Sequence, residues 1–190
     1  KIQIRISTID LPHLCCFAVV LFFYLAICCK PKILIADEPT TALDVTVQKH
    51  ILSLIARLQQ KFGMSVIFIT HDLGVVAENT DEMFVMYAGK IVEKGPTKKV
   101  FTRLSHPYTR GLFAAIPEYD LPNNENISLN EESNKIRFTT IPGRVPEVWQ
   151  KNKGCNFKDR CIFAKEKCFS KEPNNFYIDN DHFVNCFYPF

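Results

Sequence analysis

The sequence predicts an α/β fold with a parallel β-α-β core. Residues 32–38, KILIADE, form a short apolar run that ends in two carboxylates, which is typical of a buried strand in a parallel sheet. An amphipathic helical pattern follows from residue 45, and a second apolar run, SVIFIT at 65–70, follows that helix. Two strands joined through a helix in this way lie parallel, and the crossover between them is right-handed.

The predicted helix between the two strands has clear start and stop signals. Pro39 ends the first strand, Asp44 is placed to cap the helix, and Gly63 is placed to end it. Apolar residues recur on one face at helical spacing: Val47, Ile51, Leu54, Ile55, Leu58 and Phe62. We therefore expect this face to pack against the two strands.

Shorter elements are predicted after the second strand. LGVVAEN (73–79) predicts a short helix, and EMFVMYAGKIVEKG (82–95) alternates like a hairpin that turns at residues 88–90. TKKVFTR and HPYTRGLFAAI predict two further short helices. His106 lies at the start of the second of these and is expected to cap it locally.

Composition divides the chain into three predicted parts. Residues 1–116 carry the α/β pattern. Residues 117–134 are polar, Asn-rich and acidic, which is typical of a linker. Residues 135–190 have Pro-rich turns, no long helical period and four cysteines, and they predict a small irregular region.

The bulk composition is that of a globular protein. The chain is 47% apolar and 23% charged, which excludes a disordered chain. Its formal net charge of +3 is too small to favour binding to nucleic acid.

The opening apolar run, LCCFAVVLFFYLAICC at 14–29, contains no charged residue. A helix of this length spans about 24 Å, whereas a bilayer core is about 30 Å thick and needs about 20 apolar residues. We expect a helix packed beside the first strand, a placement that the family resemblance given below implies. The alternatives are a membrane span and a disordered or mistranslated lead-in.

Side chains with catalytic chemistry follow each predicted strand. Asp37 and Glu38 end the first strand and His71 follows the second, and the carboxyl ends of parallel strands share one edge of a sheet. An aspartate there can hold Mg²⁺, and an adjacent glutamate can orient or deprotonate a water molecule. A histidine at the same edge can stabilise a phosphate that is being cleaved. The alternative is a solvated strand end and a histidine that starts a helix.

ILIADEPTTALD followed by VIFITHDLGVV resembles the Walker B, D-loop and switch-histidine succession of ABC-type ATPases. The resemblance implies that residues 1–116 are the C-terminal part of a P-loop ATPase domain that uses ATP and Mg²⁺. It implies that Asp37 serves Mg²⁺ and that Glu38 is the catalytic base. His71 would then be the switch histidine, and Asp44 the D-loop aspartate at the seam of a dimer.

Two other motifs of that family are absent or altered. The 190 residues contain no phosphate-binding G-x-x-x-x-G-K-[ST] loop. Where the family has its glycine-containing signature, the sequence reads PHLCCFAVV, with Cys15 and Cys16 in place of two glycines. We therefore expect that the chain alone does not hydrolyse ATP efficiently, and that it is the second half of a subunit or a degenerate copy of one.

The four C-terminal cysteines form a candidate metal site. The set is Cys155, Cys161, Cys168 and Cys186. A cytosolic ATPase disfavours disulfides, and zinc sites usually have closer cysteine pairs, whereas the spacing of iron–sulfur ligands varies widely. The spacing alone leaves an iron–sulfur cluster, a zinc ion and unligated thiols open. His182 is the nearest spare ligand, and we expect it on a surface loop.

HPYTRGLFAAIP, TIPGRVPEVW and GCNFKDRC resemble the C-terminal region of the ATP-binding subunits of oligopeptide and dipeptide importers, in the peptide/nickel family. The resemblance implies a peripheral subunit at the cytoplasmic face of the cell membrane that energises peptide import. Its implied partners are a second ABC ATPase subunit, transmembrane permease subunits and, indirectly, an extracytoplasmic peptide-binding protein, with no nucleic acid. Some family members hold a [4Fe–4S] cluster on such cysteines, which implies that role for the four named above. The alternatives are a small iron–sulfur module and a fragment of a non-transport ABC ATPase.

Overall fold

The structure is a computed structural model, and it describes residues 25–28, 30–41, 43–116, 141–146 and 153–190. Backbone contacts divide the chain into two compact units, Lys1–Thr80 (unit 1) and Asp81–Phe190 (unit 2). Residues 25–28 are helical, whereas the rest of the predicted helix over the apolar run 14–29 lies outside the described residues. The predicted linker at 117–134 also lies outside them.

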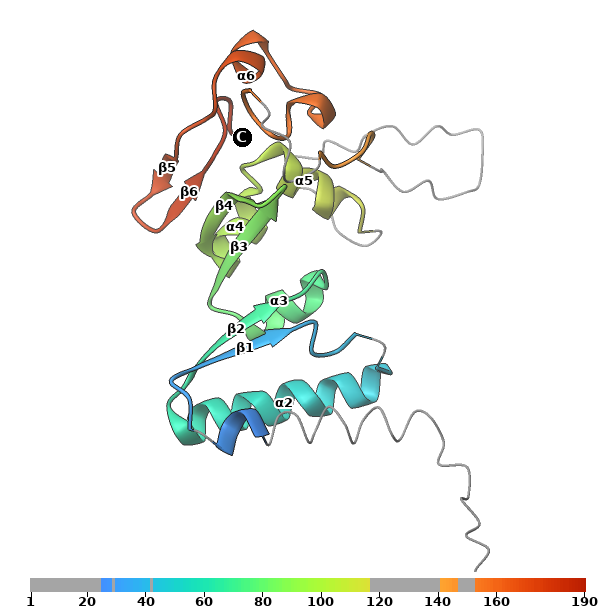
Figure 1. Ribbon diagram of the computed structural model, residues 1–190, viewed down its shortest axis with the longest axis vertical. Helices are drawn as coiled ribbons and strands as arrows, with labels where there is room; N and C mark the ends of the chain where they lie inside the picture. Colours follow the sequence, from blue (N-terminus) through green and yellow to red (C-terminus); the bar gives the residue numbers. More distant parts are fainter. Residues whose placement is uncertain (1–24, 29, 42, 117–140, 147–152) are drawn as a thin grey trace, which may run out of the picture. The chain divides into compact units, whose positions relative to one another are not determined.

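Unit 1 contains the predicted β-α-β core, and the α/β fold class is confirmed (Figure 1). Its elements in chain order are β1 (Ile33–Asp37), α2 (Val45–Phe62), β2 (Ser65–Ile69) and α3 (Leu73–Asn79). Strands β1 and β2 pair in parallel, with Ile33 opposite Ser65 and Asp37 opposite Ile69. The carboxyl ends of the two strands therefore lie side by side.

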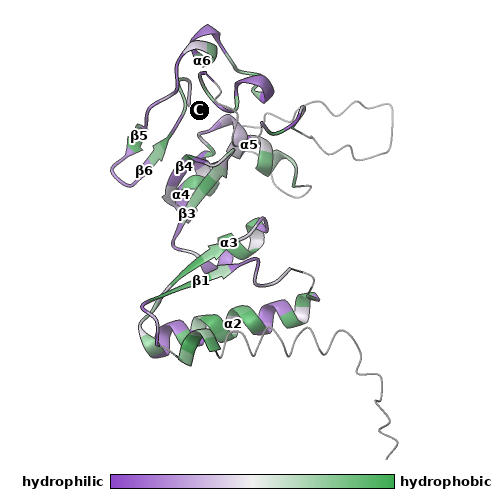
Figure 2. Ribbon diagram, viewed as in Figure 1, coloured by the Kyte–Doolittle hydropathy of each residue, from purple (hydrophilic) through white to green (hydrophobic). Residues whose placement is uncertain are grey.

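Helix α2 begins and ends where its cap residues predict. The Asp44 side chain accepts hydrogen bonds from the backbone N–H of Thr46 at 3.0 Å and of Val47 at 2.9 Å. Gly63 ends the helix in the left-handed region with φ 63°, where glycine has no steric penalty. Figure 2 shows hydrophobic and hydrophilic residues mixed along α2, as expected for a helix with one buried face. The helix buries Ile51 and Ile55, which were predicted, and also Leu52, which was not.

The strands of unit 1 are not buried on both faces, so that part of the prediction is wrong. Leu34 and Ala36 on β1 are 6% and 5% exposed. The alternate residues point to the other face, where side chains remain about half exposed: Ile33 57%, Ile35 63%, Ile67 48% and Ile69 49%. The reason is that α2 lies along one face of the sheet, while the described residues leave much of the other face accessible (Figure 1).

Unit 2 is built on a four-stranded antiparallel sheet with the order β3-β4-β6-β5. Its elements in chain order are β3 (Glu82–Tyr87), β4 (Lys90–Pro96), α4 (Thr97–Arg103), α5 (Pro107–Ala114), the 3₁₀ helix η1 (Lys158–Arg160), α6 (Glu166–Ser170), β5 (Phe176–Asp179) and β6 (His182–Val184). The predicted hairpin of β3 and β4 turns at Ala88 and Gly89, which both have positive φ, 46° and 76°. Two such residues are typical of the tight turns that fit the twist of a hairpin.

The sheet of unit 2 joins segments that are far apart in the sequence. Lys94 on β4 lies opposite Phe183 on β6, and Glu93 lies opposite Val184. The boundaries predicted at residues 116 and 134 rest on changes in amino-acid composition, whereas the division at residue 80 rests on contacts in the folded backbone. Four apolar residues in the core of unit 2 are 0% exposed: Val100, Leu104, Phe113 and Val184.

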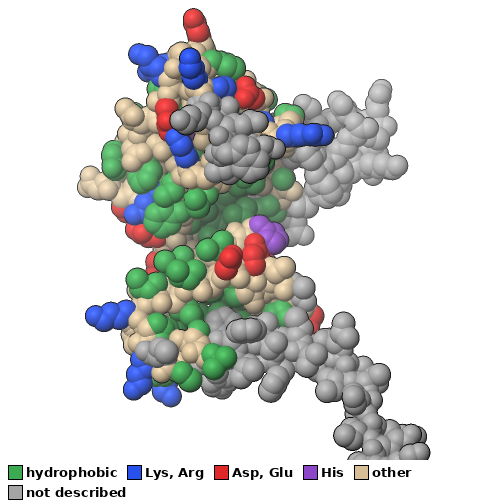
Figure 3. Space-filling view, viewed as in Figure 1, with side chains coloured by type: hydrophobic (Ala, Val, Ile, Leu, Met, Phe, Trp, Pro, Cys, Tyr) green, Lys and Arg blue, Asp and Glu red, His purple; other side chains and the backbone are tan. Residues whose placement is uncertain are grey.

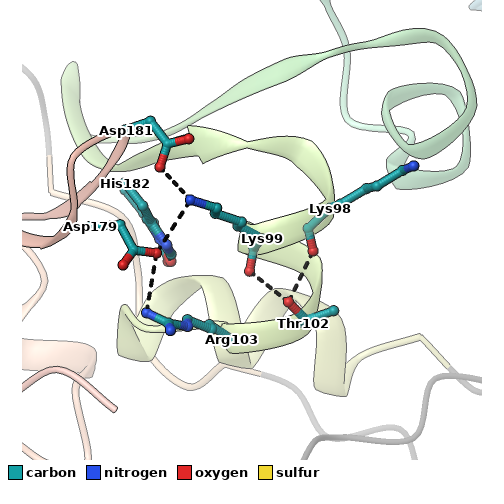
Figure 4. A network of polar contacts seen from close by, with 8 residues as sticks. Lys98, Lys99, Thr102, Arg103, Asp179, Asp181 and His182 are labelled. Carbon is teal, nitrogen blue, oxygen red and sulfur yellow. Dashed lines mark hydrogen bonds and ion pairs between the residues drawn. The ribbon is translucent and has the colours of Figure 1, made fainter.

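Charged side chains tie α4 to the turn between β5 and β6 (Figure 4). Lys99 Nζ lies 2.6 Å from Asp181 Oδ1 and 3.4 Å from Asp179 Oδ2, and Arg103 Nη1 lies 3.5 Å from the same Asp179 atom. All of these groups are more than one-third exposed, so the pairs hold the turn in place but add little to stability.

Within the part of the chain that the structure describes, no helix has both the length and the apolar character needed to cross a membrane.

Candidate functional site

The structure of unit 1 brings Glu38 and His71 into direct contact. Glu38 follows β1, and its N–H donates to the carbonyl of Ile69 at the end of β2 at 2.8 Å. The Nδ1 atom of His71 lies 2.8 Å from Glu38 Oε1. Figure 3 shows a histidine beside acidic side chains on the surface of this unit. The parallel register explains the contact, because it aligns the ends of the two strands.

A third side chain completes the environment of Glu38. The hydroxyl of Thr41 donates to Glu38 Oε2 at 2.6 Å. The role of Thr41 was not predicted, although a threonine three residues after a carboxylate in a turn can indicate such a hydrogen bond. Glu38 itself has φ 46°, a conformation that is uncommon outside glycine and that often marks a functional position.

The hydrogen bonds around Glu38 and His71 favour their charged forms. The hydrogen bonds from Thr41 and then from His71 lower the pKa of Glu38. The hydrogen bond to Glu38 raises the pKa of His71. The side chains are 38% and 81% exposed, so water and salt screen this pair. The Glu38 carboxylate is ionised at neutral pH and can accept a hydrogen bond from water.

The other two predicted residues of unit 1 lie at nearby element ends. Asp37 is the last residue of β1 and is exposed, beside Glu38. Asp44 caps α2 through Oδ1, a structural role that the sequence also predicted. The side chains of Gln48 and Asp72 hydrogen bond at 3.2 Å and join α2 to the start of α3, a contact that was not predicted.

In unit 2 the four predicted cysteines line one small cavity. Cys155, Cys161, Cys168 and Cys186 face it together with His106, Pro107, Phe157, Lys158, Phe163, Phe187 and Tyr188. The thiols come from the loop before η1, the end of η1, helix α6 and the segment after β6. All four cysteines are free of disulfides. The convergence of thiols that are up to 31 positions apart is the main observation in this unit.

Close backbone packing brings two of these cysteines together. The N–H of Cys155 donates to the carbonyl of Cys168 at 2.8 Å. The preceding Gly154 has φ 87°, and a Cβ atom there would lie 2.3 Å from the same carbonyl oxygen. Only glycine fits this approach without moving the backbone. Gly154 is therefore part of the architecture of the cavity.

Burial in the cavity disfavours the thiolate form of three of the four cysteines. Burial raises the pKa of Cys155 and Cys161, and it raises that of Cys186 to about 11. Lys165 lies over the ring of Tyr188 and Lys167 over that of Phe187, each at 4.4 Å from the ring centroid. Lys158 lines the cavity itself, and its positive charge lowers the pKa of Cys155 against the effect of burial.

The donor set of the cavity is chemically suited to an iron–sulfur cluster. Four thiols are the usual ligands of such a cluster. Within the described ranges, no group of three or more His, Cys, Asp or Glu residues is placed to hold a single metal ion.

His182 is not the surface histidine that the sequence predicts. It lies on β6 with 0% exposure, and its Nε2 atom is 2.9 Å from Oε1 of the equally buried Glu93. The prediction is wrong because the pairing of β6 with β4 encloses this residue. The prediction for His106 is confirmed, since its side chain caps α5 by accepting a hydrogen bond from the N–H of Tyr108.

Comparisons with known proteins relate the chain to peptide import ATP-binding proteins. Residues 92–168 match the family described as "Oligopeptide/dipeptide transporter, C-terminal region". A putative peptide import ATP-binding protein of Brucella melitensis is 48% identical over 149 residues, which are 78% of this chain and 41% of the relative. One of Brucella ovis is 44% identical over 162 residues, 85% of this chain and 46% of the relative. The chain thus spans less than half the length of the curated relatives it matches.

Among solved structures, cbiO1 from Clostridium perfringens, described as part of the ABC transporter complex cbiONQ, is similar in part. It shares 39% sequence identity and a TM-score of 0.36, covering 38% of this chain and 29% of the other.

Proposed function

We propose that this chain, which is related to the ATP-binding proteins of peptide importers, carries the hydrolytic end of an ATPase that drives the import of oligopeptides or dipeptides. The observation that carries the proposal is the contact of 2.8 Å between Glu38 and His71 at the adjoining strand ends. It joins the two residues that the family resemblance makes the catalytic base and the switch histidine. The relatives supply the transport class.

Glu38 is proposed to act on the attacking water. Its ionised carboxylate takes a proton from the water as the oxygen bonds to the γ-phosphorus of ATP and the bond to ADP breaks. His71 holds Glu38 Oε1 and Thr41 holds Oε2, so the carboxylate is oriented on both sides. His71 is itself exposed and can also contact the γ-phosphate.

Asp37 is proposed to hold Mg²⁺, because it ends β1 beside Glu38 and is exposed. Mg²⁺ would neutralise charge on the phosphates of ATP, and one carboxylate is sufficient to anchor it through water molecules. Asp44 is proposed to lie at the seam with a second ATPase subunit, since it is exposed at the start of α2. The remaining proposed partners are membrane permease subunits at the cytoplasmic face of the membrane and, through them, an extracytoplasmic peptide-binding protein.

ATP hydrolysis by a chimera tests this proposal. Residues 30–190 replace the matching part of the Brucella melitensis relative, so that the phosphate-binding loop comes from that protein. We expect the chimera to bind and hydrolyse ATP, and Glu38→Gln to lower kcat by about 10²–10⁴-fold, the usual effect of losing a general base. ATP binding should persist in that variant. Glu78→Gln, on the exposed side of α3, is the matched control and should keep the rate. Hydrolysis by Glu38→Gln at the rate of the unmodified chimera would contradict the proposal.

We also propose that Cys155, Cys161, Cys168 and Cys186 hold a [4Fe–4S] cluster. Its support is the convergence of four thiols on one cavity whose lining includes Lys158, with Lys165 and Lys167 over two aromatic rings of that lining. When bound, such a cluster supplies either one-electron redox chemistry or structural cross-linking of the segments that ligate it. The residues of this chain provide the thiols, exclude water with aromatic rings and balance negative charge.

Iron and sulfide analysis of the chain purified without oxygen tests the cluster. We expect a brown protein with iron and sulfide in equal amounts, and a loss of both in Cys161→Ser. Cys28→Ser is the matched control, because Cys28 is an exposed cysteine of unit 1. A colourless protein with stoichiometric zinc, or iron that persists in Cys161→Ser, would show that the cluster proposal is wrong.

A further inference from the structure

A buried carboxylate anchors the loop at the start of α5. Glu93 on β4 is 0% exposed, and it accepts hydrogen bonds from the N–H of Ser105 at 3.0 Å and of His106 at 2.9 Å. His182 on β6 contacts the same carboxylate at 2.9 Å. Releasing any of these contacts would leave a buried polar group without its partner, which is costly. The sheet therefore fixes the position of His106.

The side chain of His106 joins the start of α5 to the C-terminal segment. Its Nδ1 accepts a hydrogen bond from the N–H of Tyr108 at 3.0 Å, and the ring also hydrogen bonds to the backbone of Asn185. One acceptor and one donor nitrogen are what a neutral imidazole offers. Burial lowers the pKa of His106 to about 4, so the ring is neutral at physiological pH. Both ring nitrogens are thus used by backbone groups.

Asn185 directly precedes Cys186, the fourth thiol of the cavity. Asn185 is held by two further hydrogen bonds, from its N–H to the carbonyl of Val92 at 2.7 Å and from its side chain to that of Ile91 at 2.9 Å. His106 and Cys186 both line the cavity. A displacement of the Asn185 backbone therefore moves the Cys186 thiol.

We infer that His106 is a positioning residue for the four-cysteine cavity, where its imidazole fixes the Asn185 backbone and thereby holds the Cys186 thiol at the cavity wall. The iron-binding part of this inference rests on the proposed cluster, whereas the part that concerns the thiol needs no cluster. The competing explanation is that His106 only caps α5. The two explanations differ in what a shorter capping residue would do.

His106→Asn separates capping from positioning. Asparagine is a good N-cap and keeps an oxygen for the N–H of Tyr108, but it is too short to reach the Asn185 backbone as well. His106→Gln is the conservative variant, with a longer side chain whose amide can still donate a hydrogen bond. His50→Asn is the matched control, because His50 is an exposed histidine on α2. Circular dichroism checks that each variant is folded.

The measurement is the rate at which N-ethylmaleimide modifies each cysteine of the iron-free chain, followed by mass spectrometry with Cys28 as internal reference. We expect His106→Asn to raise the rate at Cys186 about fivefold relative to Cys28, the effect of losing one hydrogen bond. His106→Gln should fall between this variant and the wild type, and His50→Asn should match the wild type. In the iron-loaded chain, His106→Asn should weaken iron retention about tenfold or more, as for other residues that support metal ligands.

A folded His106→Asn variant that is modified at Cys186 at the wild-type rate and retains its iron would overturn the inference. If His106→Asn does not fold, the rate at which Cys186 is modified in His106→Gln decides between the two explanations. A wild-type chain that holds no iron overturns the cluster proposal alone, and the modification rates still decide the role of His106.

Discussion

Apolar side chains are enclosed to different degrees in the two units. In unit 2 Val100, Leu104, Phe113 and Val184 are 0% exposed. In the described part of unit 1 one face of the sheet is covered, and Ile33, Ile35, Ile67 and Ile69 on the other face are between 48% and 63% exposed. The sheet of unit 2 also has an exposed apolar face, with Phe84 at 51% and Met86 at 58%, so the two units differ in how completely their most buried residues are enclosed and not in having an open face.

The two units also differ in how deeply a carboxylate and its histidine partner are buried. Unit 2 buries a carboxylate, Glu93, and satisfies it with two backbone N–H groups and a histidine. The carboxylate of interest in unit 1, Glu38, is partly exposed, and its histidine partner is mostly exposed. Buried networks rigidify a fold, whereas exposed groups at a strand end are available to a ligand. We infer that the polar pair of unit 2 supports a structure and that the pair of unit 1 serves chemistry.

The largest loss of stability is expected from a substitution in the core of unit 2. Phe113→Ala should lower the free energy of unfolding of unit 2 by about 3–5 kcal/mol, because it removes a fully buried ring. Hydrogen exchange with mass spectrometry, read on peptides from 81–116 and 153–190, measures this. Phe84→Ala is the matched control, since Phe84 is 51% exposed on β3, and it should change that free energy by no more than about 0.5 kcal/mol. Equal effects of the two variants would mean that unit 2 has no consolidated core.

A smaller effect is expected at the cap of α2. Asp44→Ala should lower the free energy of unfolding of unit 1 by about 1 kcal/mol, because it removes two hydrogen bonds to the first helical turn. Asp44→Asn keeps an acceptor and should be nearly neutral. Thermal unfolding followed by circular dichroism compares the two variants, and a loss of equal size in both would assign the effect to charge.

A still smaller effect is expected on the open face of unit 1. Ile35→Thr should change the free energy of unfolding by no more than about 0.5 kcal/mol, because Ile35 is 63% exposed. The same variant should reduce self-association, since it interrupts an apolar patch. Urea unfolding and light scattering measure the two effects. A destabilisation like that expected for Phe113→Ala would show that this face is covered in solution.

The smallest effect is electrostatic and concerns Glu38 and His71. The pKa of His71 is raised, so its contribution to stability is present at low pH and is lost as the pH rises through that value. The pKa of Glu38 is lowered, so its contribution is lost as the pH falls through that value. The pair therefore stabilises unit 1 between the two pKa values. Titration of His71 by NMR should show a pKa above 6.5 that falls in Glu38→Gln, and an unchanged value in that variant would contradict the contact.

Much of unit 1 could be predicted from the sequence because its signals are local. The helical period, the cap at Asp44 and the glycine at 63 define α2. The parallel arrangement of β1 and β2 then places Glu38 beside His71. Exposure of the outer face of the sheet could not be predicted, because a short apolar run has the same sequence pattern whether one face of the strand or both faces are covered.

The architecture of unit 2 was harder to predict because its contacts are distant in sequence. Strand β6 pairs with β4 about 90 positions earlier, and three residues make too short a run to give a strand signal. The burial of His182 follows from that pairing and was missed with it. The four cysteines were found from their residue type, but their convergence on one cavity with His106 needed the structure.

Peptide uptake tests the central claim most directly. The chimera with residues 30–190 of this chain is expressed in a bacterium that lacks the corresponding peptide import ATP-binding protein, and the uptake of a radiolabelled tripeptide is measured. We expect the chimera to restore uptake, Glu38→Gln to abolish it and Glu78→Gln to leave it intact. Uptake restored equally by the chimera and by Glu38→Gln would contradict the claim that hydrolysis at Glu38 drives import.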